Sequence, residues 1–199
     1  MGSERLCVVL AGGAGQRIGG RKPQRLFGDR SLGALALSLA AGFADHVALA
    51  VRDPAQAEGL GPAELLFDPP GIEGPLAGVL SALTHGARMG VAQVLTIPCD
   101  TPRLPDDLYT RLAAALEQSP DALAARASDG AHDHPACALW RVEALGPVQR
   151  YAHTGRRSLH GALSELNAAT VEWSEPDMDW FLNINTRDQL KSTTPPITD

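Results

Sequence analysis

The fold is indicated near the start of the chain by the stretch Leu6-Cys7-Val8-Val9-Leu10, which is followed by Ala11-Gly12-Gly13. Five apolar residues in succession are typical of a strand that is buried on both faces, as strands of parallel sheets are. The glycines end the strand and allow backbone N–H groups to approach a ligand closely. The stretch therefore predicts the first strand of a parallel sheet, with a binding loop at its carboxyl end.

Short apolar runs alternate with helical patterns in the first half of the chain. Further strands are expected at residues 47–51, 64–67 and 94–97, and helices at 32–43, around 75–83 and at 105–117. Ser31 is the expected N-cap of the first helix, and Pro75 suits the first turn of the second. This alternation predicts an α/β fold with a doubly wound, mostly parallel sheet flanked by helices.

The pattern of the second half is less regular. Strands are expected at residues 122–126, 136–140, 171–173 and 181–184, and helices at 142–152, 159–166 and 188–191. No linker divides the chain, so residues 1–191 are predicted to form a single domain with an earlier part at about 1–103 and a later part at about 104–191. The tail at 192–199, which contains Pro-Pro, is expected to be disordered.

Composition excludes several classes of protein. The chain has 199 residues, of which 44% are hydrophobic, and a formal net charge of -6. The hydrophobic share supports a core, and the acidic balance argues against general nucleic-acid binding. The longest uncharged apolar stretch, Leu32–Ala44, is shorter than the ~20 residues that span a bilayer. Three dispersed cysteines among apolar residues are typical of reduced thiols, so a cytoplasmic location without membrane attachment is expected.

The loop after the first strand combines glycine with positive charge. Residues 12–23 contain five glycines and three cations, which are Arg17, Arg21 and Lys22. Because glycine N–H groups can surround phosphate oxygens, phosphate binding is favoured over a flexible surface turn. The spacing matches neither the dinucleotide fingerprint nor the Walker A loop. Lys22 is one of only two lysines, beside fifteen arginines. Codon usage explains the ratio but not the position of this lysine.

Two carboxylates also follow expected strands. Asp100 comes after the strand at 94–97, where it could hold Mg²⁺ near phosphates in the glycine loop, although it could equally start a turn. Asp68 could accept hydrogen bonds from a base or ribose, and a helix start with packing glycines at Gly74 and Gly78 explains the same segment. His132-Asp133-His134 has no further ligand at a zinc spacing and is interpreted as a solvated loop.

Seven segments carry recognisable motifs in order along nearly the whole chain. They are Leu10–Gly13 (LAGG), Arg17–Gly20 with Lys22, Gly74–Gly78 (GPLAG), Cys99–Pro102 (CDTP), Asp133–Pro135 (DHP), Gly155–Arg157 and Asn183–Thr186 (NINT). Each is weak alone, but in register they resemble one family, the molybdenum cofactor guanylyltransferases of the nucleotidyltransferase superfamily.

The resemblance implies a Rossmann-like nucleotidyltransferase fold and an enzyme that joins GTP to the molybdenum–molybdopterin cofactor, giving the guanine dinucleotide form and pyrophosphate. It implies Mg²⁺ as the cofactor, GTP and molybdopterin as partners, and transient contact with cofactor-synthesis or acceptor proteins. The part at 1–103 would bind the nucleotide, and the part at 104–191 would face the pterin.

The resemblance also assigns roles to residues of this sequence. The catalytic residues would be Lys22, Arg17 and Asp100. The nucleotide would be bound by Leu10, Ala11, Gly12, Gly13, Lys22, Asp68 and Asp100. The metal would be held by Asp100 and Asn185. The pterin side would include His134, Arg156, Arg157 and Asn183.

Other activities on the same fold stay open. They are a molybdopterin cytidylyltransferase, a sugar-phosphate nucleotidyltransferase and, outside enzymes, a module that carries the pterin cofactor without chemistry. Ala50 stands where some members of the family place an asparagine that contacts guanine, whereas the LAGG and GPLAG motifs favour GTP over CTP. A pure carrier would have no need of Arg17, Lys22 and Asp100 together.

Overall fold

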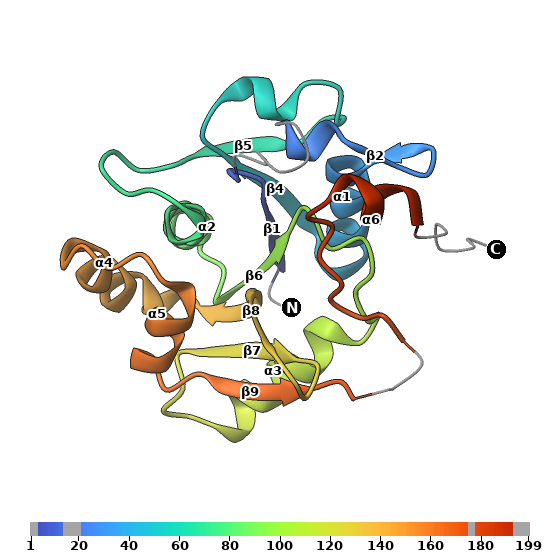
Figure 1. The fold of residues 1–199 in the computed structure, drawn as a ribbon. Helices are drawn as coiled ribbons and strands as arrows, with labels where there is room; N and C mark the ends of the chain where they lie inside the picture. Colours follow the sequence, from blue (N-terminus) through green and yellow to red (C-terminus); the bar gives the residue numbers. More distant parts are fainter. Residues whose placement is uncertain (1–3, 14–20, 175–177, 193–199) are drawn as a thin grey trace.

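The computed structural model describes residues 4–13, 21–174 and 178–192, and within them the chain forms a seven-stranded sheet with helices on both faces (Figure 1). The strands lie in the order β5-β4-β1-β6-β8-β7-β9. Their bounds are β1 Leu6–Leu10, β4 His46–Val51, β5 Glu64–Phe67, β6 Gln93–Pro98, β7 Ala124–Ser128, β8 Asp133–Arg141 and β9 Ala169–Glu172. The helices are α1 Leu32–Phe43, α2 Pro75–Met89, α3 Leu108–Gln118, α4 Leu145–His153, α5 Leu159–Glu165 and α6 Arg187–Ser192.

The four strands of the first half are parallel, and β1 lies between β4 and β6. The expectations for the first strand and for 64–67 are confirmed at the same residues. Leu10, the last residue of β1, pairs with Ala50 of β4 and Pro98 of β6. The carboxyl ends of these strands therefore lie along one edge of the sheet, where ligands bind in open α/β folds.

Two hydrophobic cores lie on opposite faces of the sheet. One face is covered by α2, α4 and α5, and the other by α1 and α3. Successive residues of β1 alternate between them, since Val8 packs into the first core and Val9 into the second. A strand with core on both sides must be apolar throughout, which explains the unbroken run in the sequence. The doubly wound arrangement is confirmed.

The second half departs from several expectations. β8 runs antiparallel to both β6 and β7, so the sheet is mixed at this end. The strand expected at 122–126 begins only at Ala124, and the helix expected from 105 begins at Leu108. The strand expected at 181–184 is wrong, because the segment is irregular and Phe181 has φ 64°, outside the strand region.

Several short elements carry no periodic signal in the sequence. They are the antiparallel pair β2 (Leu26–Phe27) and β3 (Arg30–Ser31) and the 3-10 helices η2 (Lys22–Gln24), η3 (Pro54–Ala57) and η4 (Val142–Ala144). Ser31 is confirmed as the N-cap of α1, where its Oγ accepts a hydrogen bond from the N–H of Ala34 at 3.3 Å. Of the expected disordered tail, only Ser192 is described, at the end of α6.

Among the described residues, no helix is both long and apolar enough to cross a membrane.

A stability prediction arises from α2, which packs closely on β6. A Cβ added at Gly86 would lie 2.5 Å from Val94 Cγ2 and 3.2 Å from Val91 Cγ2. Overpacking of this kind costs ~1–3 kcal/mol, against a gain of ~1 kcal/mol from the better helix propensity of alanine. We expect Gly86→Ala to lower the free energy of unfolding in urea by about 1 kcal/mol.

Gly42, on the exposed side of α1, provides the matched control. A Cβ there meets no atom of the described residues within 4 Å. Gly42→Ala should therefore raise the free energy of unfolding by up to ~1 kcal/mol. Equal effects of the two substitutions would contradict the close approach of α2 to β6.

Candidate functional site

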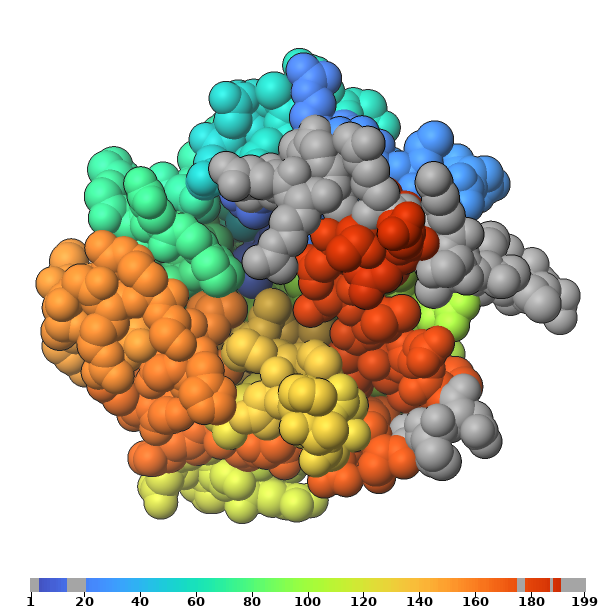
Figure 2. All heavy atoms as spheres, viewed as in Figure 1, coloured from blue at the N-terminus to red at the C-terminus, as the bar shows by residue number. Residues whose placement is uncertain are grey.

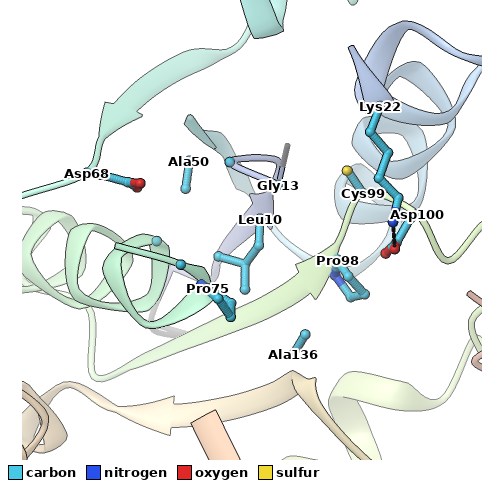
Figure 3. Close-up of a pocket in the computed structure, with 13 residues that line it drawn as sticks. Leu10, Gly13, Lys22, Ala50, Asp68, Pro75, Pro98, Cys99, Asp100 and Ala136 are labelled. Carbon is cyan, nitrogen blue, oxygen red and sulfur yellow. Dashed lines mark hydrogen bonds and ion pairs between the residues drawn. The ribbon is translucent and has the colours of Figure 1, made fainter. Parts of the chain in front are cut away.

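A cavity of about 230 Å³ opens at the carboxyl ends of the parallel strands. Figure 2 shows the molecule hollowed between the green segment of α2 and the yellow segment near β8, and Figure 3 shows the lining residues. The lining comes from the ends of β1, β4 and β6, from the residue after β5, from the starts of η2 and α2, and from β8. It consists of Leu10, Gly12, Gly13, Lys22, Ala50, Asp68, Gly74, Pro75, Gly78, Pro98, Cys99, Asp100 and Ala136. The cavity thus unites the segments Leu10–Gly13, Gly74–Gly78 and Cys99–Pro102.

The loop after β1 brings its backbone to the cavity. Gly12 and Gly13 line it, and a Cβ on Gly12 would lie 3.4 Å from Arg52 Cγ and 3.6 Å from Asp68 Oδ2. Ala11 lies behind the cavity, where it is fully buried and its N–H donates to the carbonyl of Ala50 at 2.9 Å. The loop therefore presents glycine backbone to a ligand while Ala11 anchors it to the sheet.

Asp68 forms one end of the cavity. It follows β5, and its N–H donates to the carbonyl of Val51 at 3.3 Å. Its Oδ1 is buried and has no hydrogen-bond partner among the residues that the structure describes. Burial raises the pKa of this carboxyl to about 6, although the positive charge of Arg52 lowers it in part. A buried acceptor without a partner is costly, so this oxygen is suited to a ligand that supplies N–H donors.

The start of α2 forms the wall beside Asp68. Gly74 has φ 82°, a conformation that favours glycine, and Pro75 occupies the first turn of the helix. A Cβ at Gly78 would lie 3.0 Å from Leu10 Cδ2 and 3.4 Å from Ala50 Cβ. Gly78 therefore lets the helix pack closely on the strands beneath the cavity, and Ala50 contributes only a methyl group to the floor.

Lys22 and Asp100 line the opposite end of the cavity from Asp68 (Figure 3) and form a cluster with Asn185. Lys22 Nζ donates to Asp100 Oδ2 and, at 2.9 Å, to Asn185 Oδ1. The Lys22 and Asp100 side chains are only 14% and 15% exposed. The sheet brings Asp100 to this point at the end of β6. The C-terminal segment brings Asn185, because Ile184 N–H donates to the carbonyl of Asp100 at 2.8 Å.

The donors of this cluster fit a divalent metal. Asp100 and Asn185 present two hard oxygen atoms that already converge on one cation, the ammonium group of Lys22. Mg²⁺ commonly takes one or two protein oxygens and completes its coordination with substrate phosphates and water. Among the described residues, no group of three or more His, Cys, Asp or Glu side chains could hold a metal ion without such help.

Cys99 also lines the cavity, directly before Asp100. Its side chain is 5% exposed, and burial raises the pKa of the thiol to about 12. Because only the thiolate is a good nucleophile, Cys99 is a packed thiol rather than a reactive one.

Two of the residues expected on the pterin side lie together in a second hollow. His134 of β8 and Asn183 line it with Trp180 and Phe181. The His134 ring stacks on Phe181 at 4.7 Å between centroids, and its Nε2 lies 3.0 Å from Asp129 Oδ2. The Thr101 hydroxyl donates to Asn183 Oδ1, so this hollow adjoins the segment that carries Asp100.

The other two lie elsewhere, at the turn between α4 and α5. Arg156 pairs with Glu165 and lies over the Tyr151 ring, 4.2 Å from its centroid. Arg157 Nη1 donates to the carbonyl of Ala152 at 2.7 Å, and its Nη2 to that of Gly71 at 3.2 Å. Neither arginine lines the cavity or the second hollow. Arg17, expected to contact phosphate, lies outside the described residues.

Some lining residues have no chemical signal in the sequence. Pro98 and Ala136 line the cavity, and Phe181 and Trp180 line the second hollow. Ala136 lies two residues after His134 on β8, but the pairing of β8 with β7 shifts register in between. Ala136 packs against the core of α2, whereas His134 stacks on Phe181 of the opposite core, so strand alternation does not predict the place of Ala136. Phe181 carries only the signal of a buried apolar residue.

Comparison with known proteins gives a consistent result. Residues 7–169 match the model of the MobA-like NTP transferase domain. A molybdenum cofactor guanylyltransferase of Rhizobium meliloti (strain 1021) is 33% identical over 92% of this chain and 88% of its own. One of Rhodopseudomonas palustris (strain BisB5) is 39% identical over 92% and 89%. Molybdopterin-guanine dinucleotide biosynthesis protein A from Archaeoglobus fulgidus has a solved structure with a TM-score of 0.77 at 25% identity, covering 94% of this chain and 95% of that one.

Proposed function

Because this chain belongs to the MobA-like NTP transferase family and is a nucleotidyltransferase, we propose that it transfers GMP from GTP to the molybdenum–molybdopterin cofactor and releases pyrophosphate. The support from the chain itself is one cavity whose two ends differ in chemistry, with a hydrogen-bond acceptor at one end and a charged cluster at the other. Asp68 offers at one end a carboxylate oxygen for which the described residues supply no partner, and Lys22 with Asp100 lies at the other end. A nucleotide needs both, since its base carries N–H donors and its phosphates carry negative charge.

The base end favours guanine. The cavity floor and walls are mostly apolar, from Leu10, Ala50 and Pro75, and suit a stacked ring. Guanine presents two adjacent donors, N1–H and the N2 amino group, which match the two oxygens of one carboxylate. Asp68 would accept both, and its Oδ1 would gain a partner that the described residues do not supply.

The phosphate end would perform the chemistry. A terminal phosphate of the pterin attacks the α-phosphorus of GTP in line, the new P–O bond forms, and the bond to the β-phosphate breaks to release pyrophosphate. The nucleophile is already an anion, so no covalent enzyme intermediate is required and the chain supplies positioning and charge. Lys22 would donate to the phosphates, and Arg17 would add a second cation.

Asp100 and Asn185 would hold Mg²⁺, which supplies Lewis-acid neutralisation of phosphate charge when bound. The Gly12 and Gly13 backbone would contact the nucleotide. The pterin would occupy the part of the chain at 104–191, within one domain that also contains the nucleotide part at 1–103. Of the residues expected there, His134 and Asn183 adjoin the Asp100 segment and are the stronger candidates.

The proposal is tested by measuring pyrophosphate release with GTP, CTP, ATP and UTP, each with and without the molybdenum–pterin cofactor and with Mg²⁺ or EDTA. We expect release only with GTP, pterin and Mg²⁺ together. A preference for CTP would assign a cytidylyltransferase. Release with a sugar phosphate as acceptor would assign a sugar nucleotidyltransferase, and pterin binding without release under any condition would assign a carrier.

A further inference from the structure

The ammonium group of Lys22 is already paired within the chain, although Lys22 is expected to contact phosphate. Its ammonium group does not extend free into the cavity but donates to Asp100 Oδ2 and Asn185 Oδ1. These are the same two oxygen atoms that would hold the metal. The side chain is 14% exposed, so the contact is largely shielded from water.

The backbone of Lys22 is fixed while its side chain has reach. Lys22 begins η2, its carbonyl accepts from the N–H of Arg25 at 3.2 Å, and the next residue, Pro23, is buried. The carbonyl of Pro23 lies against Gly33 of α1, where an added Cβ would approach it to 3.0 Å. From this anchor the four-carbon side chain also lines the nucleotide cavity. Rotation about its own single bonds could move Nζ between Asp100 and a phosphate in the cavity.

Charge makes the two occupants of the cluster mutually exclusive. With Lys22 in place, the single negative charge of Asp100 is already neutralised by one ammonium. A divalent ion entering beside it would meet a positive charge at close range in a site of reduced dielectric. A metal that arrives with a nucleotide brings phosphate charge for the ammonium to join. The ammonium group of Lys22 is then attracted to the phosphate and no longer repels the metal from Asp100.

We propose that Lys22 is a built-in cation that keeps the metal site closed to free divalent ions and moves onto phosphate when the metal–nucleotide complex enters. This inference rests on the proposed function for the identity of the nucleotide, and on the contacts of Lys22 for the competition. It predicts that the metal and the nucleotide bind with strong mutual dependence, and that Lys22 is the cause.

The first test measures binding of Mn²⁺, without nucleotide, to the full chain by electron paramagnetic resonance. Lys22→Met keeps the length of the side chain and removes its charge. We expect it to bind Mn²⁺ at least about tenfold more tightly than the wild type, because a unit charge close to the site is removed. Arg30→Met, which removes one positive charge from an exposed side chain of β3, is the matched control and should bind like the wild type.

Two further results sharpen this test. Lys22→Met with Asp100→Asn should lose the gained affinity, which would locate the Mn²⁺ at this cluster. Lys22→Met that binds Mn²⁺ no more tightly than the wild type would overturn the proposal. Neither measurement uses GTP. Both results would therefore still test the role of Lys22 if the chain proved not to transfer GMP.

The second test needs no variant and uses the scarcity of lysine. Lys22 and Lys191 are the only lysines, so chain labelled with ¹³C and ¹⁵N in lysine alone gives two side-chain signals. We expect one signal to show slow ammonium hydrogen exchange in the free chain. It should be unmoved by Mg²⁺ alone and shift on adding Mg²⁺ with GTP, CTP, ATP or UTP, whichever binds. A Lys22 signal that shifts with Mg²⁺ alone, or stays in place with every Mg²⁺–nucleotide pair, would contradict the proposal.

Discussion

Replacing Asp100 with asparagine is expected to lower the rate of pyrophosphate release from GTP by about 10³-fold. The substitution keeps the shape of the side chain and one oxygen but removes the charge. Asp100 is the only carboxylate in the cluster with Lys22 and Asn185, among the residues that the structure describes. The metal would then lose its one anionic protein ligand, and the cation end of the cavity would become a pair of neutral amides beside a lysine.

The measurement is the steady-state rate at saturating GTP and pterin, titrated with Mg²⁺. Asp106→Asn is the matched control, because Asp106 is exposed in the loop that follows the same strand, and its loss of charge should leave the rate unchanged. A thermal melt of both variants separates a lost ligand from a lost fold. If Asp100→Asn retained a rate near that of the wild type with an unchanged Mg²⁺ requirement, the metal role of Asp100 would be refuted.

The sequence predicts the parallel half of the fold well because burial there leaves a simple signal. β1, which packs between two layers, and β5, which is an edge strand, both lie at the residues expected from their apolar runs. The alanine-rich stretch that forms β7 has no such signal, because alanine favours helices and is depleted in strands. The strand therefore begins two residues later than the expected start at residue 122. At Phe181–Ile184 the apolar pattern predicts a strand, but it reflects only the burial of Phe181 and Ile184, because an apolar run indicates burial and does not fix φ and ψ.

The sequence predicts which residues belong to the site, but it does not predict which of them contact one another. Asp68 and Asp100 each follow a recognisable strand, so their place at one edge of the sheet follows from topology. The approach of Asn185 to Lys22 does not, because the two residues are separated by 163 positions and meet through an irregular segment. Arg156 and Arg157 are a second case, in which the sequence predicts a role in binding that their contacts do not support. A motif indicates that the arginines matter, but only the structure reveals their partners within the chain.

Replacing Asp68 with asparagine is expected to lower kcat/KM for GTP by about 10–10²-fold, with the change mainly in KM. Guanine offers two donors to this end of the cavity, and hydrogen bonds to a charged group contribute ~1.5–3 kcal/mol. Asparagine accepts only one of the donors and turns an amino group toward the other. Adenine carries a donor beside an acceptor and suits an amide better. The ratio of kcat/KM for GTP to that for ATP should therefore fall further than the GTP value alone.

Stability and pH distinguish a recognition role of Asp68 from a merely structural one. The pKa of its carboxyl is raised to about 6 from an ordinary 3.8, so the folded state holds this proton longer than the unfolded state does. The contribution of this carboxyl to the free energy of unfolding therefore falls as the pH rises from about 4 to about 6. At pH 7 the carboxylate is ionised, and its burial destabilises the folded state. Asp68→Asn should then melt at the same temperature as the wild type or higher, while it uses GTP less well.

In the wild type, KM for GTP should rise as pH falls below about 6, where the carboxyl gains a proton and loses its second acceptor. Glu73→Gln, an exposed change in the same loop, should show neither effect. A variant Asp68→Asn that both melted lower and kept its preference for GTP would show that Asp68 supports the loop and does not read the base.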